Sequence, residues 1–220
     1  MHITKIERQK KDPSRRSVFI DGEFAFGVSL DGLVQFSLYE GRELSNTESE
    51  QLQQSVQEDD AKRTALKYLS RRPRTEKEIA DYLAKKKYDH STAQRVIGKL
   101  NGLHLLDDSE FARMFCRDKI LRKPVGERVL RSALLRKGVN KEIIDAVMPE
   151  FFSYDAEREL ALTAGKKQYT KLLRSRSRIE KLQLKNRLFN FLLHRGFDFD
   201  TVQYVVRQLI AEKQSQRDFQ

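Results

Sequence analysis

The apolar positions of this 220-residue chain fall into three stretches that repeat one helical pattern. A shift of 51 residues places Leu83 on Leu134, and a further shift of 58 residues places Leu134 on Leu192. The same shifts align Ile79, Ala93, Val96, Ile97 and Leu100 with Leu130, Ile144, Val147, Met148 and Phe151, and then with Leu188, Val202, Val205, Val206 and Leu209. Within each stretch these positions recur every three or four residues, which is the period of an amphipathic helix. Such self-similarity is typical of a helical repeat protein.

Each repeat is predicted to contain three helices, and the three units are expected at 61–108, 109–154 and 155–220. The first helices are expected at 61–71, 109–121 and 155–173, the second at 75–86, 127–137 and 181–195, and the third at 91–101, 140–150 and 198–212. The third unit carries extra residues around "QYTKLLRSRSR". Short helices bury little apolar surface alone, so we expect neighbouring units to supply each other's core. The predicted fold is mainly α, with three tandem three-helix units forming a curved α-solenoid.

The predicted helix ends carry local signals. Thr75 with Glu78 has the spacing of a capping box, in which two side chains satisfy the first free N–H groups of a helix. Asp107 is placed in the same way before the second unit. Gly138 and Gly196 follow second helices, where glycine permits the left-handed conformation that ends a helix. Lys87 occupies this place in the first unit, at a cost on the order of 1 kcal/mol if it is left-handed.

Residues 1–60 have a different pattern. Apolar and polar residues alternate in "SVFIDGEFAFGV", and Asp21-Gly22 suits a type I′ hairpin turn. We expect Val18 and Ile20 on one face of a small N-terminal β-hairpin extension, with Phe24, Phe26 and Val28 on the returning strand. "HITKIERQ" could add a third strand, and a linking helix is expected to start at Ser45. The simplest role for this extension is to cover the end of the helical array.

Charge and cysteine content narrow the class of protein. The chain has 43 Lys and Arg against 32 Asp and Glu, a net charge of +11, and the excess lies after residue 60. A basic body favours an anionic partner, although solvated lysines explain many basic proteins. Cys116 is the only cysteine and no apolar run is long enough to span a membrane. We therefore expect a monomeric cytoplasmic protein that does not bind membranes.

Catalytic chemistry is not indicated. The four histidines lack metal-ligand spacing. Asp107 and Asp108 could form a magnesium-binding pair, but the better interpretation is a helix N-cap. Cys116 is expected in the core rather than as a nucleophile. We expect no enzyme activity, no cofactor and no metal.

Basic residues recur at two places in the repeats, and these are the candidate partner contacts. They are Arg71, Arg72, Arg74, Arg122 and Lys123 around the proline turns, and Lys85, Lys86, Lys87, Arg136, Lys137 and Arg195 at the ends of the second helices. Cations at helix C-termini also complement the helix dipole, which explains Lys85, Lys86 and Lys137 but not the arginines of the turns. A regular row of cations suits nucleic-acid phosphates or a helical protein polymer with an acidic groove.

Four motifs in one order resemble the RecX family of regulatory proteins: "YLSRRPRTEKEIADYL", "LLDDSEFARMF", "LLRKGVNKEIIDAVM" and "LLHRGFDFDTVQYVV". Lys87 replaces the glycine usual in the first unit, and His194 stands where the family has arginine. The resemblance implies a non-enzymatic modulator of the RecA recombinase in homologous recombination and DNA repair. Such a protein would lie in the groove of the RecA–single-stranded-DNA filament and inhibit its ATPase, extension and strand exchange. The alternative is a sequence-independent DNA-binding protein of helix-turn-helix-like repeats.

Overall fold

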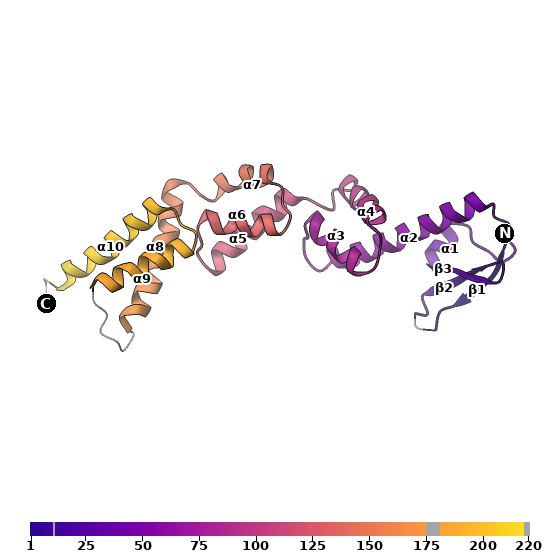
Figure 1. The fold of residues 1–220 in the computed structure, drawn as a ribbon, viewed down its shortest axis with the longest axis horizontal. Helices are drawn as coiled ribbons and strands as arrows, with labels where there is room; N and C mark the ends of the chain where they lie inside the picture. The colour runs from indigo at the N-terminus through magenta and orange to yellow at the C-terminus, as the bar shows by residue number, and fades with distance from the viewer. Residues whose placement is uncertain (11, 175–180, 218–220) are drawn as a thin grey trace. The chain divides into compact units, whose positions relative to one another are not determined.

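The computed structural model describes residues 1–10, 12–174 and 181–217, and most of them are helical (Figure 1). The chain begins with strands β1 (Ile3–Arg8), β2 (Arg15–Ile20) and β3 (Glu23–Ser29), which are followed by helix α1 (Leu30–Gln35). The strands form one antiparallel sheet in the order β1-β2-β3. The predicted hairpin is therefore confirmed, and β1 is the third strand that the sequence allowed.

The hairpin turn is as predicted, but one face assignment is wrong. Asp21 and Gly22 both have positive φ, 48° and 89°, as a type I′ turn requires. Phe19 pairs with Phe24, and the pairing of β2 with β3 then shifts, so that Val18 pairs with Phe26. The two-residue turn therefore places Phe24 on the face opposite Val18, where its ring meets that of Phe19 edge-on at 5.9 Å, and the shift returns Phe26 to the face of Val18. Phe24 is consequently 59% exposed, whereas Val18 and Val28 are buried.

Helix α2 (Asn46–Leu69) joins the N-terminal sheet to the first repeat without interruption. The linking helix expected from Ser45 and the first repeat helix expected at 61–71 are one continuous helix, so residue 60 lies inside it. The helix starts where predicted, because the Ser45 hydroxyl accepts a hydrogen bond from the N–H of Glu48 at 3.1 Å. Its first half contributes Leu52 and Val56 to the core beneath the sheet, and its second half contributes Ala61 and Ala65 to the first repeat. One helix thus serves two cores.

The two cores are also linked by polar contacts around Asp60 of α2. One carboxylate oxygen of Asp60 pairs with Arg15 of β2, and the other accepts a hydrogen bond from the Tyr88 hydroxyl at 2.9 Å. Arg15 also donates to the carbonyl of Gly27 in β3 at 3.0 Å. A fragment beginning at residue 61 would lack Asp60 and half of α2, so the sheet and the first repeat depend on one another.

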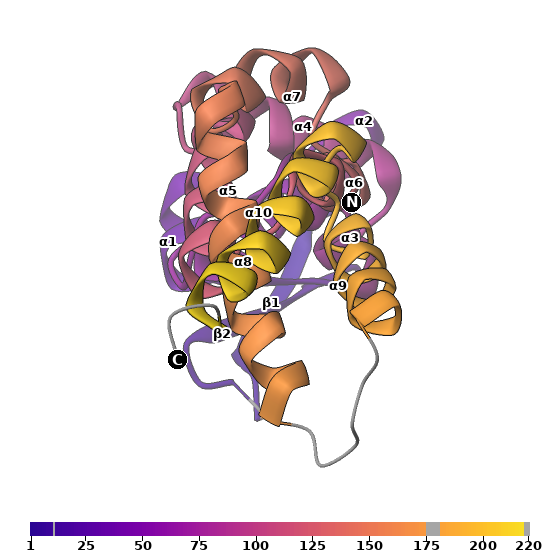
Figure 2. The ribbon, with the colours of Figure 1, turned by 90° about the vertical axis from the view of Figure 1, so that its left-hand side faces the viewer.

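Three helices form each of the repeats. Repeat 1 consists of the second half of α2 with α3 (Glu76–Lys85) and α4 (His90–Gly102). Repeat 2 consists of α5 (Asp108–Arg122), α6 (Glu127–Arg136) and α7 (Lys141–Val147), which continues into the 3-10 helix η1 (Met148–Glu150). Repeat 3 consists of α8 (Tyr154–Arg174), α9 (Lys181–His194) and α10 (Phe199–Arg217), which pack pairwise against one another (Figures 1 and 2). The predicted extra residues of the third unit fall partly on 175–180, outside the described residues.

The second helix of every repeat ends in the same way, which confirms the predicted register. Lys87, Gly138 and Gly196 have φ of 69°, 85° and 85°. The N–H of the following residue donates to the carbonyl of Leu83, Leu134 or Leu192 at 3.1–3.4 Å, as in a Schellman motif. All three leucine side chains are fully buried. Lys87 therefore adopts the left-handed conformation although it has a side chain.

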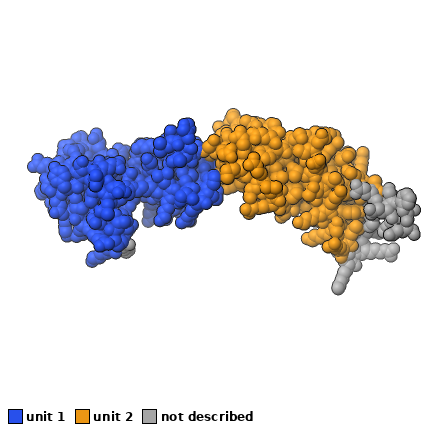
Figure 3. Space-filling model, turned by 180° about the vertical axis from the view of Figure 1, so that it is seen from behind, with its two compact units in different colours: residues 1–106 blue, residues 107–220 orange. Residues whose placement is uncertain are grey.

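Each repeat has a hydrophobic core made from its own residues, contrary to the expectation that neighbours share one. The largest buried side chains of the three clusters are Ile79, Leu83 and Leu100 in repeat 1, Leu130, Leu134 and Met148 in repeat 2, and Leu188, Leu192 and Phe197 in repeat 3. The described residues divide into two compact units, 1–106 and 107–220, so repeats 2 and 3 belong together (Figure 3). The mainly α class with three tandem units is confirmed.

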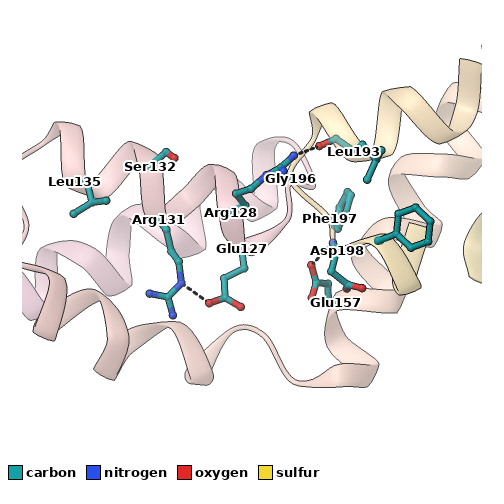
Figure 4. A pocket seen from close by; sticks show the side chains of 11 residues that line it. Glu127, Arg128, Arg131, Ser132, Leu135, Glu157, Leu193, Gly196, Phe197 and Asp198 are labelled. Atoms are coloured by element: carbon teal, nitrogen blue, oxygen red, sulfur yellow. Dashed lines mark hydrogen bonds and ion pairs between the residues drawn. The ribbon is translucent and has the colours of Figure 1, made fainter. Parts of the chain in front are cut away.

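Repeats 2 and 3 meet through backbone rather than through a shared core. The N–H of Gly126, just before α6, donates to the carbonyl of Arg195 at 2.8 Å. A Cβ on Gly126 would lie 2.3 Å from backbone atoms of Gly196 and Phe197, so only glycine permits this approach. The Arg128 guanidinium also donates to the carbonyl of Leu193 at the end of α9, at 2.7 Å (Figure 4).

Candidate partner-binding surface

The structure places the candidate basic residues at turns and helix ends, as predicted. Arg71, Arg72 and Arg74 lie between α2 and α3, Arg122 and Lys123 at the end of α5, Lys85, Lys86 and Lys87 at the end of α3, Arg136 and Lys137 at the end of α6, and Arg195 just after α9. Most are exposed, whereas Arg74, Lys137 and Arg195 are partly buried. These three therefore contribute to packing as well as to charge.

In repeat 1 an aromatic stack connects the proline turn with the end of the second helix. The guanidinium of Arg74 lies 3.8 Å from the ring centroid of Tyr68. The rings of Tyr68 and Tyr82 are stacked, with centroids 3.9 Å apart and planes 11° apart. The Nζ of Lys86 lies 5.6 Å from the Tyr82 centroid. A cation near each ring is favourable because the face of an aromatic ring is electronegative.

A hollow of about 580 Å³ opens beside this stack. The residues that line it are Tyr68, Glu78, Asp81, Tyr82, Lys85 and Lys86. Glu78 carries a double hydrogen bond from Arg72, at 3.0 and 3.2 Å, which ties one arginine of the turn to α3. The hollow therefore combines aromatic rings with charges of both signs.

One candidate basic residue in each of repeats 2 and 3 also lies against aromatic rings. The Nζ of Lys137 lies 5.5 Å from the ring centroids of both Phe111 and Phe115. Arg195 lies 5.0 Å from the centroid of Phe191 and donates to the carbonyl of Pro124 at 3.5 Å. The end of the second helix of repeat 3 therefore lies against the proline turn of repeat 2.

Arg122 has a local partner, because it pairs with Asp118 one turn earlier in α5 at 2.8 Å. Surface pairs of this kind contribute at most about 1 kcal/mol.

Sequence reasoning missed the tyrosines of the stack, Tyr68 and Tyr82. The sequence could have indicated them, because they lie on either side of the arginine-rich turn and are not among the apolar positions that align between repeats.

The groups considered for catalysis have structural roles. Cys116 is fully buried, and burial followed by the nearby charge of Glu150 raises the pKa of its thiol to about 11. The carboxylate of Asp107 accepts a hydrogen bond from the N–H of Glu110 at 2.9 Å and thereby caps α5, as predicted. Across residues 1–10, 12–174 and 181–217, no group of three or more metal-binding side chains is placed to hold an ion. No helix in the described part of the chain is long and apolar enough to cross a membrane.

Three helical units of one pattern, with basic residues at turns and helix ends, define a helical-repeat protein. Comparison with known proteins narrows this class. The family model "Regulatory protein RecX N-terminal domain" matches residues 1–45. Models of the first, second and third three-helix domains of RecX match residues 61–100, 107–148 and 156–206. The chain belongs to the RecX family of regulatory proteins, which confirms the resemblance seen in its motifs.

Individual relatives agree over nearly the whole chain. A regulatory protein RecX of Lactobacillus delbrueckii subsp. bulgaricus is 32% identical over 96% of this chain and 75% of its own length. A regulatory protein RecX of Clostridium beijerinckii is 29% identical over 95% of this chain and 96% of its own. A crystal structure of regulatory protein RecX, 26% identical, matches with a TM-score of 0.72 over 93% of this chain and 98% of that one. All three of these relatives are named as regulatory proteins and not as enzymes.

Proposed function

We propose that this protein binds the RecA–single-stranded-DNA filament and inhibits its ATPase, extension and strand exchange. Membership of the RecX family supports a regulatory role. The observation that carries the proposal is the repetition of one unit: Leu83, Leu134 and Leu192 hold one position in three separate cores, and each is followed by the same left-handed turn next to basic residues.

Repetition of this kind suits a partner that is itself repetitive. A helical filament presents the same surface on successive protomers, so each repeat can make a similar weak contact. Linked contacts reinforce one another, because binding of one unit raises the effective concentration of the next. Every additional 1.4 kcal/mol of binding free energy lowers the dissociation constant tenfold. A protein held along a filament in this way would hinder both movement and addition of protomers.

The test is an ATPase titration of a preformed filament. We expect inhibition well below one copy of this protein per recombinase protomer, because one bound chain spans several protomers. A requirement for saturating ratios would favour simple coating of DNA instead. If the ATPase is unchanged at every ratio, the proposal fails.

Charge variants can locate the binding surface without disturbing packing. Arg71, Lys85, Lys123 and Arg136 are exposed candidate residues. Their combined replacement by alanine should leave the fold intact and raise the concentration needed for half-inhibition at least tenfold. Arg72 and Arg74 are less suitable, because their replacement would also remove the contacts with Glu78 and Tyr68.

A matched control removes the same number of charges elsewhere. Lys166, Lys167, Lys171 and Arg207 are exposed and lie on α8 and α10, outside the proline turns and the ends of the second helices. Their replacement by alanine should reduce inhibition much less. Equal losses in both variants would show that net charge, not the predicted positions, governs binding.

A second candidate function, sequence-independent binding to single-stranded DNA, is favoured by the stacked tyrosines of repeat 1. Aromatic rings beside cations form stacking platforms for nucleic-acid bases, worth about 1–3 kcal/mol per base. Tyr82→Phe should then keep the affinity for an oligothymidylate, while Tyr82→Ala should lower it about tenfold. Equal affinities of both variants and the parent would argue against this platform.

A further inference from the structure

The junction between repeats 2 and 3 contains a cavity of about 560 Å³ (Figure 4). Both walls belong to the compact unit 107–220. Leu135 of α6 and Phe199 of α10 contribute exposed apolar surface, since they are 52% and 59% exposed, and Leu193 of α9 adds to the lining. Leu135 and Phe199 come from different repeats, so each repeat contributes apolar surface to the lining.

Acidic side chains face the same cavity. Glu127 of α6, Glu157 of α8 and Asp198 before α10 line it together with Arg128 and Arg131. Both arginines are already engaged, because Arg131 pairs with Glu127 and Asp145, and Arg128 donates to the carbonyl of Leu193. Among the described residues, no hydrogen bond or ion pair joins Glu157 or Asp198 to a cationic side chain. The cavity therefore holds an acidic pair without a cationic partner, whereas the chain as a whole carries +11.

Glu157 and Asp198, both in the cavity lining, lie next to each other, as Figure 4 shows. The N–H of Asp198 donates to the Glu157 carboxylate at 3.4 Å. Burial, and then the charge of Asp198, raise the pKa of Glu157 to about 7. Burial alone would raise the pKa of Asp198 as well, but hydrogen bonds from Thr201 outweigh it and lower that pKa. The raised pKa of Glu157 and the lowered pKa of Asp198 indicate one arrangement. Asp198 holds its charge at the start of α10, and the charge of the adjoining Glu157 carboxylate is poorly compensated by its surroundings.

We propose that this cavity receives a lysine or arginine side chain of the protein partner, with the alkyl stem against Leu193 and Phe199 and the cationic head at Glu157 and Asp198. Long basic side chains are amphipathic in this way, with an apolar stem and a charged tip. Hydrogen bonds from a cation to carboxylates are about twice as strong as neutral ones. The assignment rests on the proposed function, since the partner would be a recombinase protomer.

The same charges exclude nucleic acid from this place. Phosphates would be repelled by Asp198, which keeps its charge, and by Glu157 once it has lost its proton, in a partly apolar surrounding where charges are weakly screened. The junction is therefore a protein-facing part of the surface, in contrast to the basic turns, which suit either phosphates or acidic protein groups.

The test uses the full chain with Glu157→Gln and Asp198→Asn combined. Both replacements keep the size of the side chain, and asparagine retains the capping oxygen that accepts from the N–H of Thr201 at 2.9 Å. The variant should be at least as stable as the parent, because it loses a repulsive pair. Its dissociation constant for the recombinase filament should nevertheless rise about tenfold or more, measured by fluorescence anisotropy with labelled protein.

The control variant, Glu142→Gln with Glu159→Gln, removes two exposed acidic groups that do not line the cavity. It should bind as tightly as the parent or more tightly, because a chain of higher positive charge approaches an anionic filament faster. Equal weakening in both variants would overturn the proposal, and so would unchanged binding of the cavity variant.

The outcomes separate this proposal from the proposed function. If the parent binds no filament, the proposed function fails first. If the parent binds and the cavity variant binds equally well, the function stands and the cavity assignment is wrong. Sedimentation of the free protein covers a further outcome: self-association that the cavity variant abolishes would assign the cavity to a second copy of this chain and overturn the recombinase assignment.

Discussion

Gly126→Ala gives the sharpest structural prediction, because a single methyl group would enter the tightest contact between repeats 2 and 3. The added Cβ would lie 2.3 Å from the carbonyl carbon and oxygen of Gly196 and from the nitrogen of Phe197. Ordinary van der Waals contacts of a Cβ begin near 3.4 Å. All three atoms belong to backbone, so no side chain can rotate away. One of the two turns must therefore move by about an ångström.

The cost follows from what this movement disrupts. The hydrogen bond from the N–H of Gly126 to the carbonyl of Arg195, 2.8 Å long, would be lost or stretched, at about 1 kcal/mol. Forcing extra volume into a packed contact costs about 1–3 kcal/mol more. The variant should therefore unfold with a free energy about 2–4 kcal/mol below that of the parent. The separate cores of repeats 2 and 3 should stay intact, because neither contains Gly126.

Urea unfolding followed by circular dichroism measures the loss, and amide hydrogen exchange locates it. Exchange of the Gly126 amide should become faster. The amides of Leu134 and Leu192, which lie within α6 and α9, should stay protected. Gly98→Ala is the matched control, because Gly98 lies within α4 and its Cβ would meet no atom within 4 Å. That variant should gain about 0.5–1 kcal/mol, since alanine favours a helix over glycine.

Two results would refute the reasoning on Gly126. The first is a Gly126→Ala variant within about 0.5 kcal/mol of the parent, which is the range of ordinary surface substitutions. The second is a large loss with unchanged exchange at the Gly126 amide. Either result would mean that the two turns do not approach as closely as described.

Three further predictions concern the repeats and the acidic pair. Leu→Ala at Leu83, Leu134 or Leu192 should each lower the unfolding free energy by about 2–5 kcal/mol in urea, and a loss below about 0.5 kcal/mol would contradict the repeat register. Lys87→Gly should raise thermal stability by about 0.5–1 kcal/mol, because glycine adopts the left-handed turn without strain; a loss would mean that Lys87 makes a compensating contact. For Glu157, the raised pKa of about 7 means that the folded chain keeps a proton that the unfolded chain releases near pH 4.5. Its contribution to stability is therefore present below pH 4.5 and is lost as pH rises to about 7. Glu157→Gln should remove this dependence and raise stability at pH 8 by up to about 3 kcal/mol, as tested by parallel unfolding of both proteins between pH 4 and 8.

Local signals in the sequence were sufficient for the repeat and its helix ends. The aligned leucines are all buried, and the helix caps at Thr75 and Asp107 form as expected. Even Lys87 is left-handed like the glycines of the other repeats. These features depend on residues within a few positions of one another, so the backbone conformation follows from neighbours in the chain. The family also followed from short motifs at known spacing.

Two features that depend on residues far apart in the chain, the continuity of α2 and the pairing of β3 with β2, could not be predicted from local sequence. The positions that align between the repeats begin after residue 60, so they do not indicate that the preceding helix continues into the first repeat. The tertiary structure shows that α2 is continuous because its two halves pack on different cores, the sheet on one side and repeat 1 on the other. The bulge that places Phe26, but not Phe24, on the face of Val18 likewise depends on how β3 pairs with β2 rather than on the alternation of either strand.

For the basic residues, too, the sequence determined some features and the tertiary structure determined others. The sequence by itself determined that cations recur at turns and helix ends, because spacing along the chain places them there. Only the tertiary structure decided that Arg74 stacks on Tyr68 and that Arg195 lies against Pro124, since these partners come from different helices. It also placed Glu157 beside Asp198 in a cavity between two repeats. Residues 41 positions apart meet there because of packing between helices, and no local pattern in the chain encodes that distance.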